Sequence, residues 1–139
     1  MKGSIEILDH PADIGIKVKG KSLQELFTNA ALGTTSLIID AKTISQNVIK
    51  EISLNGNNIE ELFIKWLDEI VYLFDAEGFI VKNIKVETSH EMSLRAIIMG
   101  EKFNPDKHQV KLYLKAVTYH QLEIKQIKEG WEAIVFFDV

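Results

Sequence analysis

The residues of this chain most able to do chemistry are two aspartates that flank a short connector near the amino terminus. Asp9 and Asp13 belong to the stretch Asp-His-Pro-Ala-Asp-Ile-Gly-Ile at residues 9–16. On both sides, isoleucine and valine alternate with polar residues, as in half-buried strands. Pro11 favours an extended conformation at His10, which predicts a tight link between two strands. Two acids on a stiff turn repel each other unless a cation or a group of donors lies between them, but a purely structural turn explains them equally well.

The opposite end of the sequence adds a third acid. Residues 131–139 form an apolar strand pattern that runs into an aspartate and then a valine. Two phenylalanines directly before this aspartate should anchor the strand, so that the oxygen atoms after them are held in place. Hard oxygen ligands of this kind are those that Ca²⁺ or Mg²⁺ prefers. The predicted ligands are Asp13, Asp138 and the terminal carboxylate of Val139, with Asp9 as a weaker addition and with backbone carbonyls beside them.

Several other chemistries are absent from the sequence. Without a cysteine, the chain has no thiol nucleophile, disulfide or zinc–thiolate site. It contains no glycine-rich phosphate loop, no G-x-S-x-G motif and no H-E-x-x-H motif. None of its histidines begins a His-x-Thr/Ser phosphoesterase motif. His10 and His120 stand beside predicted strand ends, where an ordinary hydrogen-bonded role is favoured over catalysis.

Composition restricts the remaining classes of protein. A chain of 139 residues with 46% hydrophobic content is expected to form one domain, residues 1–139, with its own core. It has no apolar run of the roughly 20 residues that cross a bilayer, and it enters a strand pattern without a signal-peptide core, so a cytoplasmic protein is expected. The formal net charge of −4 argues against a broad basic surface for nucleic acid. Contact with RNA is therefore expected only indirectly, through a protein.

The elements that must position these residues are two helices and a set of strands. Ser22 with Glu25 has the spacing of a capping box, and the helix that follows carries an apolar stripe up to Ile38. A second helix is predicted over 59–74, with Gly78 as its stop. Strand patterns flank the first two aspartates and recur at 43–54, 79–87, 92–100, 110–119, 121–127 and 131–138. This order predicts an α+β domain of two layers, with two main helices packed on a mainly antiparallel (mixed) sheet of about seven strands.

Five motifs, taken together, resemble the archease family. They are D-H-P-A-D-I-G-I at 9–16, S-L-Q-E-L-F-x-N-A-A-L at 22–32, W-L-D-E-I-V-Y-L-F-D-A-E-G-F at 66–79, L-K-A-V-T-Y-H at 114–120 and the terminal F-D-V. They occur in order and extend over essentially the whole chain. Two positions depart from the family pattern. Pro11 stands where threonine is frequent, and Gln121 stands where glycine commonly follows the histidine.

The resemblance implies a protein cofactor and not an enzyme. Archeases assist the tRNA-splicing RNA ligase, which joins 3′-phosphate or 2′,3′-cyclic-phosphate ends to 5′-hydroxyl ends, uses GTP and divalent metal, and passes through a guanylylated histidine. The family accelerates guanylylation and turnover of this ligase. By this resemblance, a divalent cation, Ca²⁺ before Mg²⁺, is bound by Asp13, Asp138 and Val139, with Asp9 as an additional ligand. The residues expected to face the ligase are His10, Lys115, Thr118 and His120.

Two alternatives stay open beside this activator. Carboxylates, two histidines and a divalent ion are also the parts of a small metal-dependent phosphodiesterase, in which the metal activates water. A chaperone-like factor in RNA modification is the other alternative, and it would bind several partners instead of one.

Overall fold

The computed structural model describes residues 4–9 and 13–139, and of Asp9 and Thr88 it describes the backbone alone. The helices are α1 (Leu23–Ile38) and α2 (Ile59–Glu77), with a short 3₁₀ turn at Ala41–Thr43. The strands in chain order are β1 (Ile5–Asp9), β2 (Asp13–Gly20), β3 (Val48–Asn55), β4 (Phe79–His90), β5 (Ser93–Lys102), β6 (Ala116–Ile127) and β7 (Gly130–Asp138). Neither helix in the described part of the chain is long and apolar enough to span a membrane.

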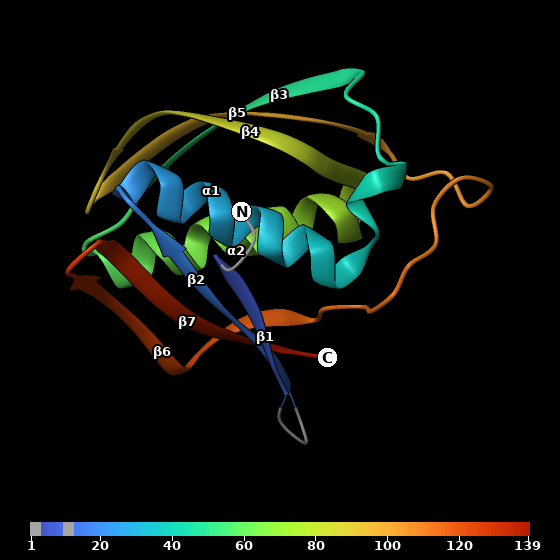
Figure 1. Cartoon of the computed structure of the whole chain (residues 1–139). Coiled ribbons are helices and arrows are strands. Elements are labelled where there is room, and N and C mark those ends of the chain that lie inside the picture. Colours follow the sequence, from blue (N-terminus) through green and yellow to red (C-terminus); the bar gives the residue numbers. More distant parts are fainter. Residues whose placement is uncertain (1–3, 10–12) are drawn as a thin grey trace.

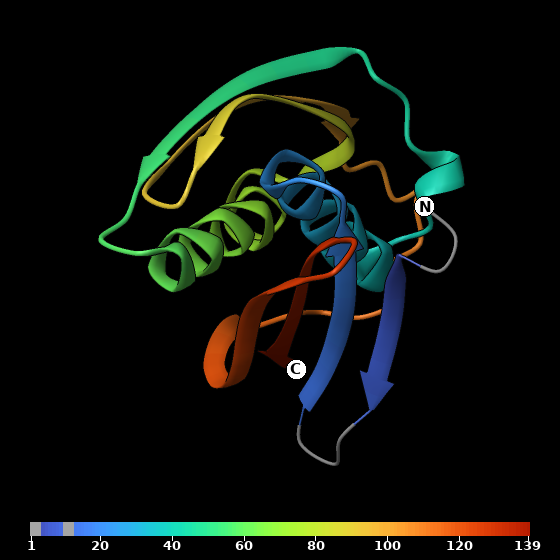
Figure 2. The same ribbon diagram turned by 60° about the vertical axis from the view of Figure 1, so that its left-hand side comes forward.

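The helices lie between two antiparallel sheets (Figures 1 and 2). One sheet has four strands in the order β1-β2-β7-β6, and the other has three in the order β3-β5-β4. Helix α1 contacts β2 and β4, while α2 contacts β6 and β4, so each helix touches both sheets. The predicted α+β class and antiparallel pairing are confirmed. The strands form two sheets instead of the single sheet we expected, so the domain has three layers instead of two. Within each sheet, all neighbouring strands pair antiparallel.

Both helices begin where the sequence predicts, and α2 continues past residue 74 to Glu77, up to its predicted stop at Gly78. The Ser22 side chain accepts a hydrogen bond from the N–H of Glu25 (3.1 Å), which caps α1. At the end of α2, Gly78 adopts φ 65°, the left-handed conformation that glycine takes without steric cost. Gly33 lies inside α1 because a Cβ atom there would approach the Cδ1 atom of Ile16 on β2 to 3.0 Å. Close packing of helix on sheet thus explains a glycine that helix propensity disfavours.

The strand boundaries differ from the prediction in three places. Residues 44–47 are irregular, so β3 begins at Val48 and not at residue 43. Strands β4 and β5 extend further than predicted and meet at a tight turn over residues 91–92. Residues 116–119 of one predicted strand and 121–127 of the next belong to a single strand, β6. Residues 103–115, predicted to be strand from residue 110, form an irregular segment that we call the crossover segment. It leaves the three-stranded sheet and enters the four-stranded sheet (Figure 1).

Candidate metal centre and its surroundings

The register between β2 and β7 places two of the predicted ligands side by side. Asp13, the first residue of β2, pairs with Asp138, the last residue of β7. Directly opposed residues of an antiparallel pair lie on the same face, with Cβ atoms about 4.5–5.5 Å apart. Asp13 is half-buried and Asp138 is exposed. Two acids from opposite ends of the chain therefore present their carboxylates next to each other at one end of the sheet.

The other predicted ligands are less fully described. Val139 directly follows Asp138, the last residue of β7, and is 42% exposed. The backbone of Asp9 pairs with that of Ile14, one register position away from the aspartate pair. His10 lies outside the described residues, as does Pro11.

The residues present fit a hard cation and not a soft one. Among residues 4–9 and 13–139, no group of three or more His, Cys, Asp or Glu side chains converges on one point. The register brings Asp13 and Asp138 to the same end of the sheet, and Val139 follows Asp138 in the sequence, so the candidate donors are two carboxylates and main-chain oxygen. This set contains only oxygen, and hard ions such as Ca²⁺ complete such sites with carbonyls and water.

A glycine and a phenylalanine form the next register pair beside the aspartates. Gly15 pairs with Phe136, and a Cβ atom added at Gly15 would lie 2.6 Å from two carbons of the phenyl ring. The ring therefore occupies the space that any other residue at position 15 would need. Although Phe136 shares the outer face with Asp138, it is only 3% exposed. We expected Phe136 to anchor β7 but did not recognise the role of Gly15; a lone glycine inside a strand pattern is the signal that marks such a close approach.

Strand β6 carries an irregularity beside this pair. Thr118 pairs with Phe136 and Glu123 pairs with Ile134, so residues 119–122 lie opposite Val135 alone. Within this bulge Gln121 has φ 59°. It is the sole non-glycine residue with a left-handed backbone in the described part of the chain. The bulge explains why two strands were predicted where there is one. The left-handed backbone also explains why glycine would suit position 121.

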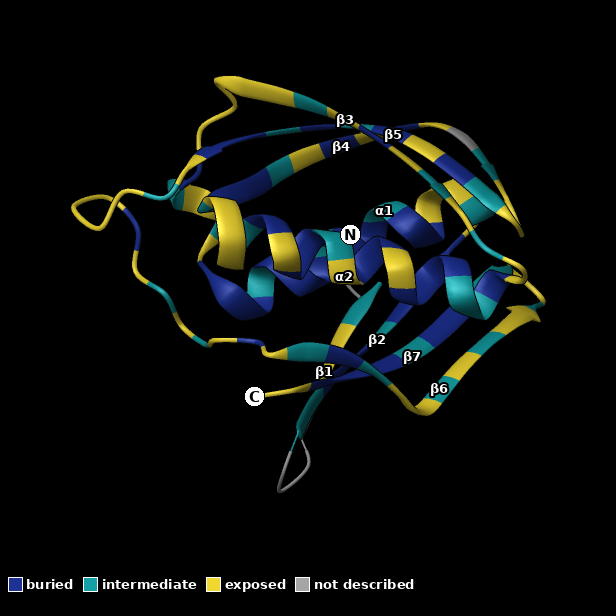
Figure 3. Ribbon diagram, turned by 180° about the vertical axis from the view of Figure 1, so that it is seen from behind, coloured by how far each residue is buried: buried dark blue, intermediate teal, exposed yellow. Residues whose placement is uncertain are grey.

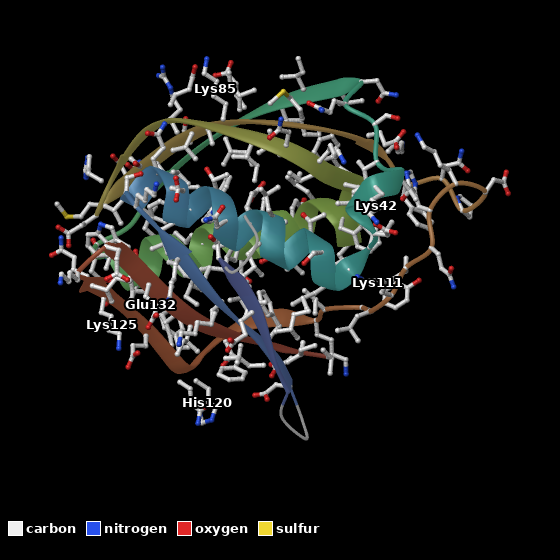
Figure 4. All side chains as sticks on the ribbon, viewed as in Figure 1. Lys42, Lys85, Lys111, His120, Lys125 and Glu132 are labelled. Carbon is white, nitrogen blue, oxygen red and sulfur yellow. The ribbon has the colours of Figure 1, made fainter. Side chains whose placement is uncertain are left out.

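Two residues expected to face a partner lie at this point of β6, His120 within the bulge and Thr118 directly before it. His120 is exposed and points away from the sheet (Figure 4), and its backbone N–H donates to the Thr118 hydroxyl (2.9 Å). Tyr119 beside it is 58% exposed. Lys115 is exposed as well, and its backbone N–H donates to the carbonyl of Asp138 (2.8 Å). The structure thus places the Lys115 backbone beside Asp138 and Thr118 opposite Phe136 on the same strand pair, with His120 in the bulge beyond it.

The backbone strain at Gln121 predicts that Gln121→Gly stabilises the protein. A non-glycine residue in the left-handed region costs roughly 1–2 kcal/mol, whereas glycine costs roughly 0.5–1 kcal/mol in unfolded-state entropy. We expect the free energy of unfolding to rise by up to about 1 kcal/mol, measured by urea unfolding. Gln126→Gly, at an exposed and regularly paired position of the same strand, is the control and should lower it. Two changes of the same sign would contradict this account.

Two buried polar residues, Glu101 and His108, contact each other and fix the crossover segment, whose last residue is Lys115. His108 Nε2 lies 2.8 Å from a carboxylate oxygen of Glu101, and the N–H of Asn104 donates to His108 Nδ1 (2.9 Å). Because Nδ1 accepts, the proton lies on Nε2 and is donated to Glu101. Hydrogen bonds from Lys107 and from the N–H of Ser45 lower the pKa of Glu101 to about 2, so the carboxylate stays ionised at neutral pH.

Comparison with known proteins identifies the family. The model of the archease protein family (MTH1598/TM1083) matches residues 5–139. A protein archease of Methanosarcina barkeri is 39% identical over 138 residues, which cover 96% of this chain and 94% of that protein. A protein archease of Pyrococcus furiosus is 36% identical, with 96% of this chain and 97% of that protein covered.

Two solved structures have the same fold. The solution structure of protein 1598 of Methanobacterium thermoautotrophicum superposes with a TM-score of 0.82 at 27% identity, and the match covers 98% of this chain and 99% of that one. The crystal structure of an archease from Thermotoga maritima, described there as a "possible chaperone", has a TM-score of 0.63 at 21% identity, with 96% of each chain covered. The second likeness shows the fold alone. With the family model matched from the first strand to the last residue, this chain belongs to the archease family.

Proposed function

We propose that this protein activates a GTP-dependent tRNA-splicing RNA ligase and does not itself catalyse ligation. The ligase joins 3′-phosphate or 2′,3′-cyclic-phosphate ends of RNA to 5′-hydroxyl ends. The observation that carries the proposal is the pairing of Asp13 with Asp138 at one end of the sheet, where the Lys115 backbone also donates to the carbonyl of Asp138. Membership of the archease family supports it, because the resemblance of the motifs implies this role.

In this proposal a divalent cation, Ca²⁺ before Mg²⁺, is held by Asp13, Asp138 and Val139. When bound, the cation would supply positive charge beside the partner-facing residues. The half-buried Asp13 and the exposed Asp138 would hold it at the surface, where a partner can reach it. Asp9 is an additional proposed ligand, and His10 an additional proposed contact. Lys115, Thr118 and His120 would contact the ligase.

An activator of this kind acts by preferring one state of its partner. It must bind the ligase conformation that reacts with nucleotide more tightly than the alternative, because equal binding to both shifts nothing. A tenfold acceleration requires only about 1.4 kcal/mol of differential stabilisation. The few exposed groups around the aspartate pair are therefore a sufficient contact surface.

A guanylylation time course with limiting ligase tests this function. Wild-type protein should speed both guanylylation and multiple turnover, whereas Asp13→Ala and Asp138→Ala should stimulate at least tenfold less while remaining folded by circular dichroism. Gln126→Ala, on an exposed position of β6 away from the aspartate pair, is the matched control and should stimulate like wild type. If both aspartate variants stimulate the ligase as well as wild type does, Asp13 and Asp138 are not needed for activation.

The same assay separates the alternatives. If the purified protein alone turns over a cyclic-phosphate RNA end, the phosphodiesterase is correct and the activator is wrong. If it has no effect on the ligase but protects several unrelated proteins from aggregation, it is a chaperone-like factor, as the description of the Thermotoga maritima protein suggests.

A further inference from the structure

No layer formed by the described residues packs on the outer face of the three-stranded sheet. The helices cover the inner face, where Ala96 and Ile98 of β5 are fully buried (Figure 2). The alternate residues of β5, Ile97 and Met99, therefore point to the opposite side and are only half-buried. Exposed stretches run along β3 in Figure 3. This outer face lies on the far side of the helices from the aspartate pair.

An apolar strip occupies the middle of this face. Ile49 of β3 is 67% exposed and pairs with Met99 of β5, and Ile97 is the next outward residue of β5. Cross-strand neighbours on one face contact each other, so the three side chains form one continuous strip. Contiguous apolar surface with a polar rim marks a site of protein contact more often than single exposed residues do.

The charges beside the strip are arranged with opposite signs on its two sides. Ile97 pairs with Glu51 on β3 and with Lys85 on β4, so one register row reads acid, isoleucine, base. Glu51 and Lys85 are both exposed, and Lys85 points away from the helices (Figure 4). Within the described part of the chain neither of them forms an ion pair, in contrast to Arg95, which pairs with Glu87 (3.7 Å).

We propose that this face binds a second copy of the same chain in a two-fold symmetric dimer. A two-fold axis parallel to the strands, above β5, places β3 of one copy over β4 of the other. The row of Glu51, Ile97 and Lys85 then lies opposite the same row of the second copy, which runs in the opposite order. Each Glu51 faces Lys85 of the second copy, and the two Ile97 side chains face each other. Such a contact is isologous, and sheets commonly pack face to face in nearly aligned directions.

The size of the face sets the strength of the dimer. Stable interfaces bury about 1,600 Å² in total, and a contact centred on the Ile97 row and the neighbouring Ile49–Met99 row of a three-stranded sheet is well below that. The dimer should therefore be weak, monomeric in dilute solution and populated only at high protein concentration. Higher salt should weaken it further, because its ion pairs are at the surface.

Charge reversal with sedimentation equilibrium tests the arrangement. Glu51→Lys and Lys85→Glu should each abolish dimerisation, since each places like charges opposite one another twice in the dimer. A mixture of these two variants should dimerise again as a heterodimer, because the two reversed charges then face each other with opposite signs, as do the two unreversed charges. Lys128→Glu, exposed in the turn before β7, is the control and should dimerise like wild type.

The result that overturns the proposal is equally specific. A protein that stays monomeric at the highest soluble concentration has no such dimer. If both single variants still dimerise like wild type, the dimer uses another surface, such as the edge of β3. If the mixture of the two variants fails to associate, the two-fold pairing is excluded. None of these three results bears on ligase activation, because Glu51 and Lys85 belong to a different sheet from Asp13 and Asp138.

Discussion

Asp138→Asn should lower the affinity of the purified protein for Ca²⁺ by about 100-fold or more, and Asp13→Asn should have a similar effect. Changes to residues that only support a metal ligand usually cost 10–100-fold in affinity, so loss of a direct ligand should cost at least as much. Asparagine keeps the size and one oxygen of aspartate but removes the negative charge. Isothermal calorimetry with Ca²⁺, and separately with Mg²⁺, measures the change.

Asp106→Asn is the matched control for this prediction. Asp106 is an exposed acid of the crossover segment, and its substitution changes the net charge of the protein by the same amount. It should leave Ca²⁺ affinity unchanged. If all three variants bind Ca²⁺ as tightly as wild type, the aspartate pair is not a metal site, whatever the protein does to a ligase.

Trp66→Ala should reduce the free energy of unfolding by roughly 3–5 kcal/mol, as truncation of large buried aromatic residues does. The Trp66 side chain is fully buried, and its indole N–H donates to the backbone carbonyl of Phe27 (2.8 Å), which links α2 to α1. The truncation would leave a cavity between the sheets and an unpaired carbonyl. Urea unfolding followed by circular dichroism measures the loss.

Tyr72→Ala provides the comparison within the same helix. Tyr72 is 54% exposed, and surface substitutions usually change stability by less than about 0.5 kcal/mol. A loss below about 1 kcal/mol for Trp66→Ala would mean that this face of α2 is a partner surface and not the core.

The helices could be predicted because their signals are local. The apolar positions of α2 recur every three or four residues, and both ends carry a recognisable capping residue, Asn58 and Gly78. The division of the strands between two sheets could not be predicted in this way. Both helices have enough apolar residues to be covered on two sides. The sequence pattern of a single strand, however, does not indicate which of two sheets the strand joins.

The candidate site was predictable in its chemistry but not in its geometry. Acids at strand ends indicated Asp13 and Asp138, whereas their direct pairing depends on a register that joins distant parts of the chain. The bulge in β6 escaped prediction because Gln121 gives no sign of a left-handed backbone. Gly15 was overlooked because its partner, Phe136, is far away in sequence.

The position of β7 inside its sheet has a consequence for the order of folding. β4 and β5 form a hairpin, and β3 pairs with β5 across the segment that contains α2 and β4, so this sheet closes shorter loops than the other sheet does. The other sheet is incomplete until β7 enters between β2 and β6, which closes a loop of nearly the whole chain, and such long-range contacts form slowly. We therefore expect the aspartate pair to assemble in the last step of folding. In native-state hydrogen exchange, the amides of β7 next to Asp138 should lose protection before those of β5.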